Sequence, residues 1–127
     1  MLTNSKAFSG FAVTDLKKAK EFYGGTLGLR VTEREGGPGG LLTLHLGSGA
    51  DVLVYPKPNH VAANYTVLNF PVSDIDAVVE ELTRRGVTFE RYAGFDQDDN
   101  GVMRAHGPPI AWFTDPAGNT LAVLQPD

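Results

Sequence analysis

Histidine and tyrosine are the side chains of this chain best suited to acid–base chemistry. The three histidines are His45, His60 and His106. A well-placed imidazole or phenol that exchanges a proton with a bound compound accelerates a reaction by about 10²- to 10⁴-fold. His45 and Tyr55 are therefore the candidate catalytic residues, with Asn69 or Arg91 as the donor to a developing oxyanion.

The histidines and one acidic run also have to be tested as metal sites. The histidines stand in three distant segments without paired ligand spacing, so surface or core positions explain each of them better. The run Asp96–Gly101 matches the first half of an EF-hand loop, but Gly107 stands where the bidentate Glu belongs. We predict a solvated acidic loop, and the longer loop 93–109 around it is a candidate lid.

Two other kinds of site are not supported by the sequence. The glycine-rich segment 36–40 is followed by neither Lys-Ser/Thr nor a helix pattern, which predicts a hairpin loop and not a phosphate cradle. The serines Ser9, Ser48 and Ser73 have no accompanying His and Asp arrangement for nucleophilic catalysis.

Composition narrows the class of protein. The chain has 127 residues, a net charge of −4 and no cysteine, which predicts one domain over 1–127 without disulfides or thiolate metal sites. It has no block of Lys and Arg to displace counterions from nucleic acid. It also lacks an apolar run that could cross a membrane and a charged start followed by an apolar stretch. We therefore expect no nucleic-acid or membrane partner, and a cytoplasmic location.

The second half of the chain repeats the plan of the first. Asp15 and Asp74 stand about 60 residues apart, and each follows a strand pattern and precedes an amphipathic helix. Gly24-Gly25 is expected to end the first helix and Gly86 the second. The predicted repeats cover about 5–57 and 64–126, each in the order βαβββ. The strands are expected at 6–13, 29–35, 41–46 and 51–55, then at 65–72, 87–92, 110–114 and 119–125.

Three motifs in this order resemble the vicinal-oxygen-chelate superfamily, which includes glyoxalases, bleomycin resistance proteins and dioxygenases. They are Asp-Leu-x-x-Ala-x-x-Phe-Tyr at 15–23, Leu-Gly-Leu at 27–29 and Phe-Thr-Asp-Pro-Ala-Gly-Asn at 113–119. The resemblance covers essentially the whole chain. It implies an α+β fold in which two βαβββ repeats form a curved mixed sheet cup.

In metal-using members of the superfamily the ligands are His, Gln or Glu on the first and last strand of each repeat. The resemblance carries these positions over to four residues of this sequence: Phe8, Leu53, Val67 and Ala122. None of them has a lone pair to offer a metal. We therefore expect neither a metal nor another cofactor.

The same four positions would form an apolar floor in the cup. Strand alternation places four further residues on that side: His45, Tyr55, Asn69 and Trp112. The opposite side, with residues such as Phe11, Leu44 and Phe113, should face the helices. The four floor residues and the four residues on their side form the predicted ligand-binding set. They suit a small aromatic or amphiphilic ligand. The alternative is that they simply fill the core.

Three functions remain open. The first, which the missing ligands favour, is a metal-free protein that binds and sequesters a small molecule, as a homodimer like many relatives of this size. The second is a lyase- or dioxygenase-type enzyme with an unorthodox or absent metal site. The third is a metal-free enzyme that uses His45 or Tyr55 as acid or base.

Overall fold

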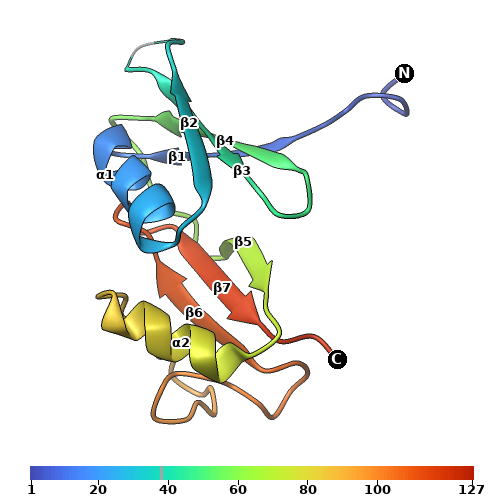
Figure 1. Cartoon of the computed structure of the whole chain (residues 1–127), viewed down its shortest axis with the longest axis vertical. Helices are drawn as coiled ribbons and strands as arrows, with labels where there is room; N and C mark the ends of the chain where they lie inside the picture. Colours follow the sequence, from blue (N-terminus) through green and yellow to red (C-terminus); the bar gives the residue numbers. More distant parts are fainter. Residues whose placement is uncertain (38) are drawn as a thin grey trace. The chain divides into compact units, whose positions relative to one another are not determined.

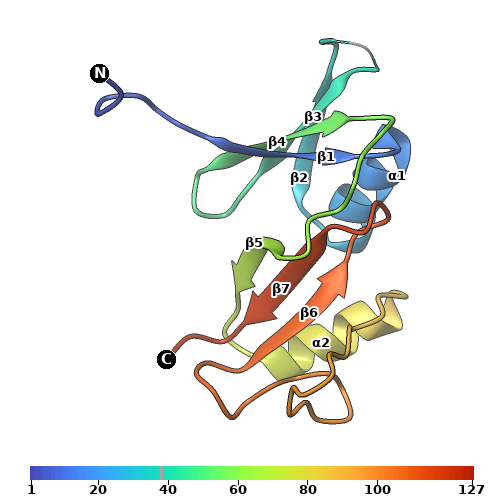
Figure 2. The ribbon, with the colours of Figure 1, turned by 180° about the vertical axis from the view of Figure 1, so that it is seen from behind.

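The computed structural model describes residues 1–37 and 39–127, so Pro38 of the predicted hairpin loop 36–40 lies outside the described residues. The chain forms two compact units, Met1–His60 and Val61–Asp127. Each unit contains a mixed sheet and a helical segment, which Figures 1 and 2 show from opposite sides. The predicted α+β class is confirmed.

The first unit has the predicted βαβββ order. Its four strands are β1 (Ser9–Val13), β2 (Arg30–Arg34), β3 (Leu41–His45) and β4 (Asp51–Pro56). They form one sheet in the order β1-β4-β3-β2, in which β1 and β4 are parallel and the other pairs antiparallel. The first and last strands of the repeat therefore lie side by side.

The helical segment of the first unit corrects the predicted helix end. The carboxylate of Asp15 accepts from the Lys18 amide and caps α1 (Leu16–Lys20), as predicted. The chain then continues as a π-helix, η1 (Glu21–Thr26), so Gly24 and Gly25 lie inside the helical segment. The Leu27 amide bonds the Phe22 carbonyl, five residues back, and Gly28 at φ +76° makes the turn that ends the segment.

The second unit follows the same order with one strand missing. Its strands are β5 (Thr66–Pro71), β6 (Ile110–Thr114) and β7 (Thr120–Leu124), in the order β5-β7-β6. The helix α2 (Ile75–Arg84) is capped by Asp74, and Gly86 with positive φ follows it, as predicted. The predicted strand 87–92 is wrong. Within the described residues, that segment makes a single bridge from Phe89 to Phe113.

A bulge interrupts the parallel pairing of β5 with β7. Thr66 pairs with Thr120 and Leu68 pairs with Leu121, so β5 advances two residues while β7 advances one. Val67 is the residue left without a ladder position of its own. This irregularity falls on one of the four positions that the superfamily resemblance singles out.

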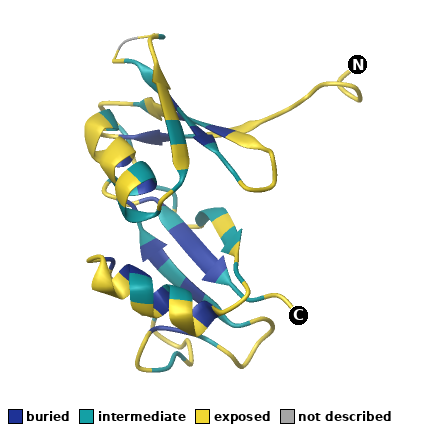
Figure 3. Cartoon of the chain, viewed as in Figure 1, coloured by how far each residue is buried: buried dark blue, intermediate teal, exposed yellow. Residues whose placement is uncertain are grey.

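In each unit the sheet packs an apolar face into the core, and β7 of the second unit is buried on its other face as well, since Ala122 is 0% exposed (Figure 3). In the first unit the buried face carries Leu42, Leu44, Val52 and Val54, and Phe11 meets the fully buried Tyr23 edge to face at 5.8 Å. In the second unit it carries Phe113, Leu121 and Val123, and α2 contacts β7. Among the helices of the described residues, none has the length and apolarity to cross a membrane.

Candidate functional site

Strand pairing sorts the side chains of the first sheet onto two faces. His45 pairs with Arg30, and Thr43 lies between Thr32 and Leu53 on the neighbouring strands. Because side chains alternate along a strand, these residues share the face away from the buried core. We call it the open face. Its members on β2, β3 and β4 are Arg30, Thr32, Arg34, Leu41, Thr43, His45, Asp51, Leu53 and Tyr55.

The open face contains a shallow hollow of about 190 Å³. Its lining residues are Phe8, Arg34, Thr43, Asp51 and Leu53. Phe8 is 71% exposed, so its ring is available to a bound molecule. The hollow thus combines an aromatic ring and an aliphatic chain with a cation, a carboxylate and a hydroxyl.

A line of hydrogen bonds crosses the open face beside the hollow. The His45 ring lies between two partners: Nδ1 is 2.9 Å from Asp51 Oδ1, and Nε2 is 2.9 Å from Thr32 Oγ1. The three residues come from three adjacent strands, β4, β3 and β2. The sheet therefore fixes the orientation of the imidazole from both sides.

The structure brings together the predicted residues of the first unit and adds others. Leu53, Tyr55 and His45 share the open face, where Tyr55 is 39% exposed. Thr32, Arg34 and Asp51 were not predicted as site residues. Alternation along β2 and β4 would have placed them there once the register of those strands was known.

In the second sheet, three predicted residues lie in one row. Trp112 pairs with Ala122, which pairs with Asn69. Thr114 and Thr120 share their side, and we call this side the aromatic face. The predicted fourth member, Val67, lies at the bulge and has no partner position in that ladder.

Two aromatic rings from the loop after α2 cover part of the aromatic face. The centroids of Tyr92 and Phe95 lie 5.5 and 5.4 Å from that of Trp112, and the rings are steeply inclined to one another. Burial and the nearby Glu90 carboxylate raise the pKa of Tyr92, against a hydrogen bond to Thr120 that lowers it. Trp112 therefore packs against two other aromatic rings and is not an uncovered residue of the predicted cup floor. Strand alternation alone could not reveal this contribution from a loop.

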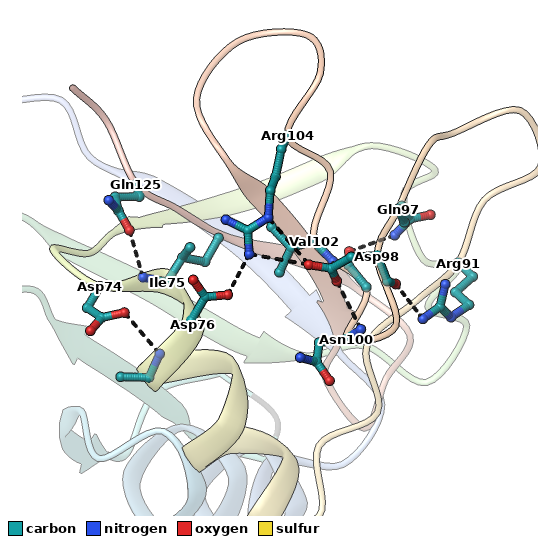
Figure 4. A network of polar contacts seen from close by, with 12 residues as sticks. Asp74, Ile75, Asp76, Arg91, Gln97, Asp98, Asn100, Val102, Arg104 and Gln125 are labelled. Atoms are coloured by element: carbon teal, nitrogen blue, oxygen red, sulfur yellow. Dashed lines mark hydrogen bonds and ion pairs between the residues drawn. The ribbon is translucent and has the colours of Figure 1, made fainter.

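The candidate lid 93–109 is tied to its own unit by polar contacts (Figure 4). The Asp98 carboxylate accepts from the amides of Asn100 and Val102 at 2.9 and 3.0 Å, and Arg104 joins it to Asp76. Burial raises the pKa of Asp98, but these hydrogen bonds lower it more, and the net shift is downward. The Asp98 carboxylate, which would bind the ion in an EF-hand loop, is instead hydrogen-bonded within the protein.

The four residues predicted to stand at metal-ligand positions do not fit a metal ion. Phe8, Leu53, Val67 and Ala122 carry no donor atom in their side chains. Among residues 1–37 and 39–127, no three His, Cys, Asp or Glu side chains come together as metal ligands would. His106 is exposed. In the described structure the buried Nε2 of His60 makes no hydrogen bond.

A second, larger hollow of about 830 Å³ lies between the helical segment of the first unit and β2. Leu16, Leu29 and Val31 contribute its apolar lining, and the Lys20–Glu33 ion pair of 3.0 Å stands at its edge. The π-helix opens onto it through Gly24 and Gly25. No motif in the sequence predicts a hollow at this place.

Comparison with known proteins agrees with the fold. Residues 7–123 match the model of the Glyoxalase/Bleomycin resistance protein/Dioxygenase superfamily, and the chain belongs to that superfamily. No curated protein is similar enough in sequence to count as a relative.

Several solved structures share this fold across nearly their whole length. TnmS3, an antibiotic binding protein from Streptomyces sp. CB03234, is 24% identical with a TM-score of 0.75, covering 98% of this chain and 99% of its own. A glyoxalase/bleomycin resistance protein from the same organism is 25% identical with a TM-score of 0.68, covering 94% and 100%. A point mutant of the fosfomycin resistance protein FosX from Listeria monocytogenes, complexed with Mn(II) and a phosphonic acid, is 11% identical with a TM-score of 0.68, covering 98% and 91%. The fold therefore occurs both in an antibiotic-binding protein and in a protein that holds a metal.

Proposed function

We propose that this protein is a metal-free binding protein that sequesters a small aromatic or amphiphilic compound on the open face of the first sheet. The observation that carries the proposal is the hollow beside Leu53. Leu53, which has no donor atom in its side chain, lines this hollow together with the exposed Phe8 ring, and both residues are predicted to occupy positions where metal-using members carry ligands. A hollow with an accessible aromatic wall and no metal ligand at these positions suits binding of an apolar surface.

The chemistry of the hollow supports an amphiphilic ligand. Phe8 and Leu53 can remove apolar ligand surface from water, which contributes about 25 cal/mol for each Å² buried. Arg34 and Asp51 offer one cation and one carboxylate beside that surface. A flat ring system with polar substituents at its rim matches this arrangement.

We propose that a homodimer completes the site. Pockets for drug-sized ligands measure about 300–1,000 Å³, whereas this one is about 190 Å³. A second surface would be needed to cover such a ligand, and another copy of the chain is our proposed source. We further propose that the whole chain acts as one domain in the cytoplasm, and that Val67, Asn69, Trp112 and Ala122 contribute to ligand binding.

The likeness to TnmS3 supports the same function, because the fold is used there by an antibiotic binding protein. The alternative supported by the wider superfamily is a lyase- or dioxygenase-type enzyme. It would require a metal site built from residues other than Phe8, Leu53, Val67 and Ala122.

The test is binding of a panel of aromatic compounds, measured by thermal shift and equilibrium dialysis, with the metal content of the protein determined in parallel. Leu53→Arg places a long charged side chain in the hollow and should weaken binding of any hit by at least about tenfold. Val61→Arg is the matched control, since Val61 is an aliphatic side chain that is 85% exposed. One bound metal ion per chain would contradict the proposal. Compounds that bind Leu53→Arg as tightly as the wild type would also contradict it.

A second candidate function, acid–base catalysis by His45, is favoured by its hydrogen bonds to Asp51 and Thr32. Such a pairing orients an imidazole as catalytic sites require. If a substrate is found among the hits, His45→Ala should abolish its turnover. Full activity in that variant would end this candidate.

A further inference from the structure

We propose that Thr32, held by His45 and Asp51, is a hydrogen-bond acceptor that selects ligands carrying a hydroxyl group on an aromatic ring. The inference rests on the proposed function and names the class of compound that the open face prefers. Two hydrogen bonds, one strand pairing and one hollow carry it.

The first step concerns the proton on the imidazole of His45. A carboxylate has no hydrogen to donate, so the 2.9 Å contact with Asp51 Oδ1 is made by a protonated Nδ1. In a neutral imidazole the other nitrogen, Nε2, is then an acceptor. Asp51 therefore determines which tautomer His45 adopts.

The second step concerns the hydroxyl of Thr32. Its Oγ1 lies 2.9 Å from Nε2, and with Nε2 as acceptor the hydroxyl hydrogen points at the ring. A threonine hydroxyl has one hydrogen and two lone pairs. In this tautomer the hydrogen of Thr32 is committed to His45, and both lone pairs remain for a ligand.

The third step concerns position. Thr32 is exposed and pairs with Thr43, which lines the hollow together with Arg34, two residues further along β2 on the same face. A flat ligand lying against Phe8 and Leu53 would displace water from this region. Displaced water leaves the lone pairs of Thr32 unsatisfied unless the ligand itself supplies a donor.

The energetic argument favours donors over their methylated analogues. An unsatisfied polar group that a ligand covers weakens binding by about 5- to 100-fold relative to a satisfied one. The open face is only partly enclosed, so the lower end of that range applies. Thr43 does not discriminate in the same way, since no described contact commits its hydroxyl to one orientation and it can donate or accept.

Two probes that differ in one group test the inference. 2-Naphthol carries the hydroxyl donor, and 2-methoxynaphthalene presents the same rings without it. We expect the protein to bind 2-naphthol at least about fivefold more tightly in equilibrium dialysis. In Thr32→Val, which removes the hydroxyl and keeps the shape, the two affinities should agree within about twofold, with 2-methoxynaphthalene binding retained as the sign of an intact fold.

Thr43→Val is the matched control, from the paired position on the next strand. It should change both affinities by the same factor and leave their ratio unchanged. Long-range ¹H–¹⁵N NMR of the ligand-free protein gives an independent readout, and it should show His45 protonated at Nδ1. Protonation at Nε2, whether in the other tautomer or in an imidazolium ring, would reverse the hydrogen bond to Thr32 and overturn the inference.

The outcomes separate the inference from the function beneath it. If both probes bind with equal affinity, or if Thr32→Val keeps the preference, the inference fails and the proposed function stands. If neither naphthalene binds while other compounds of the panel bind at Leu53, the inference alone fails. If nothing binds, both fail.

Discussion

The two sheets follow one plan, apart from the strand missing from the second, but present different chemistry on the face away from the buried core. The open face of the first sheet carries a hydrogen-bonded line, Thr32–His45–Asp51, beside an exposed phenylalanine. The aromatic face of the second sheet is partly covered by Tyr92 and Phe95, which pack on Trp112. The strands and helix caps thus recur in both units. The aromatic face differs because the segment between α2 and β6 covers part of it.

The helical segments differ in the same sense. The capped helix of the second unit is a regular α-helix of ten residues. In the first unit, five α-helical residues are followed by a π-helix, and a hollow lies between this segment and β2. Of the two helical segments, the irregular one therefore lies in the first unit, beside the larger hollow.

The largest effect is expected from Phe113→Ala, which removes a fully buried ring of the second unit that meets Phe89 at 5.5 Å. The cavity should cost about 3–5 kcal/mol of unfolding free energy, measured by urea denaturation. Hydrogen exchange should show the greatest loss of protection in residues 61–127. A loss spread evenly over both halves would show that the two units unfold together and are not independent.

Replacing Asp98 by Asn should release the loop that distinguishes the second unit. The variant keeps the size of the side chain and weakens the bonds to two amides and Arg104, so amide exchange in residues 93–109 should quicken by roughly tenfold.

The same residue predicts a pH dependence. Because the folded pKa of Asp98 lies below its usual 3.8, its ionised form stabilises the fold above that value. This stabilisation should disappear as the pH falls through the lowered pKa. Acid titration of the wild type and Asp98→Asn should therefore converge at low pH, and curves that stay parallel would exclude the linkage.

The helix caps offer a matched pair across the repeat. Asp15→Ala and Asp74→Ala each remove a carboxylate that accepts a backbone amide at 3.1 Å. Each should lower the unfolding free energy by about 1 kcal/mol. Nearly equal losses would support equivalence of the two starts. A much smaller loss of unfolding free energy for Asp15→Ala would show that the π-helix, and not the cap, stabilises the helical segment of the first unit.

The smallest effect is expected from Phe95→Ala. Phe95 is 47% exposed, so its loss should cost about 1 kcal/mol or less. Trp112 is the single tryptophan, and its fluorescence should shift to longer wavelength as its ring becomes more hydrated. An unchanged spectrum would mean that Phe95 does not shield Trp112.

Much of the fold could be predicted from the sequence because its markers are local. Asp15 and Asp74 mark the helix starts, and apolar alternation marks strands such as β6, which is found where it was predicted. The strand expected at 87–92 was wrong because, in the described part of the chain, its β-forming residues form an isolated bridge from Phe89 to Phe113 and not a continuous ladder. Gly24 and Gly25 suggested a helix end, but residues without side chains can also be accommodated inside a π-turn.

The candidate site was predictable only where it depends on alternation. His45, Leu53 and Tyr55 follow from the period of a strand, whereas Thr32 and Asp51 require the pairing of β2, β3 and β4. Tyr92 and Phe95 reach Trp112 through a loop, and no periodicity in the sequence encodes such a contact.

The parallel pairing of the first and last strand in each repeat has a consequence for how the chain folds. Gly10 pairs with Leu53 and Asn69 with Ala122, so each sheet closes a loop of about 40 to 50 residues. Closing the longer loop costs only a few tenths of a kcal/mol more in free energy than closing the shorter one. The reason is that the entropy of loop closure varies with the logarithm of loop length. During synthesis, neither sheet can be completed until the last strand of its repeat has left the ribosome, and the long-range pairing makes closure a slow step.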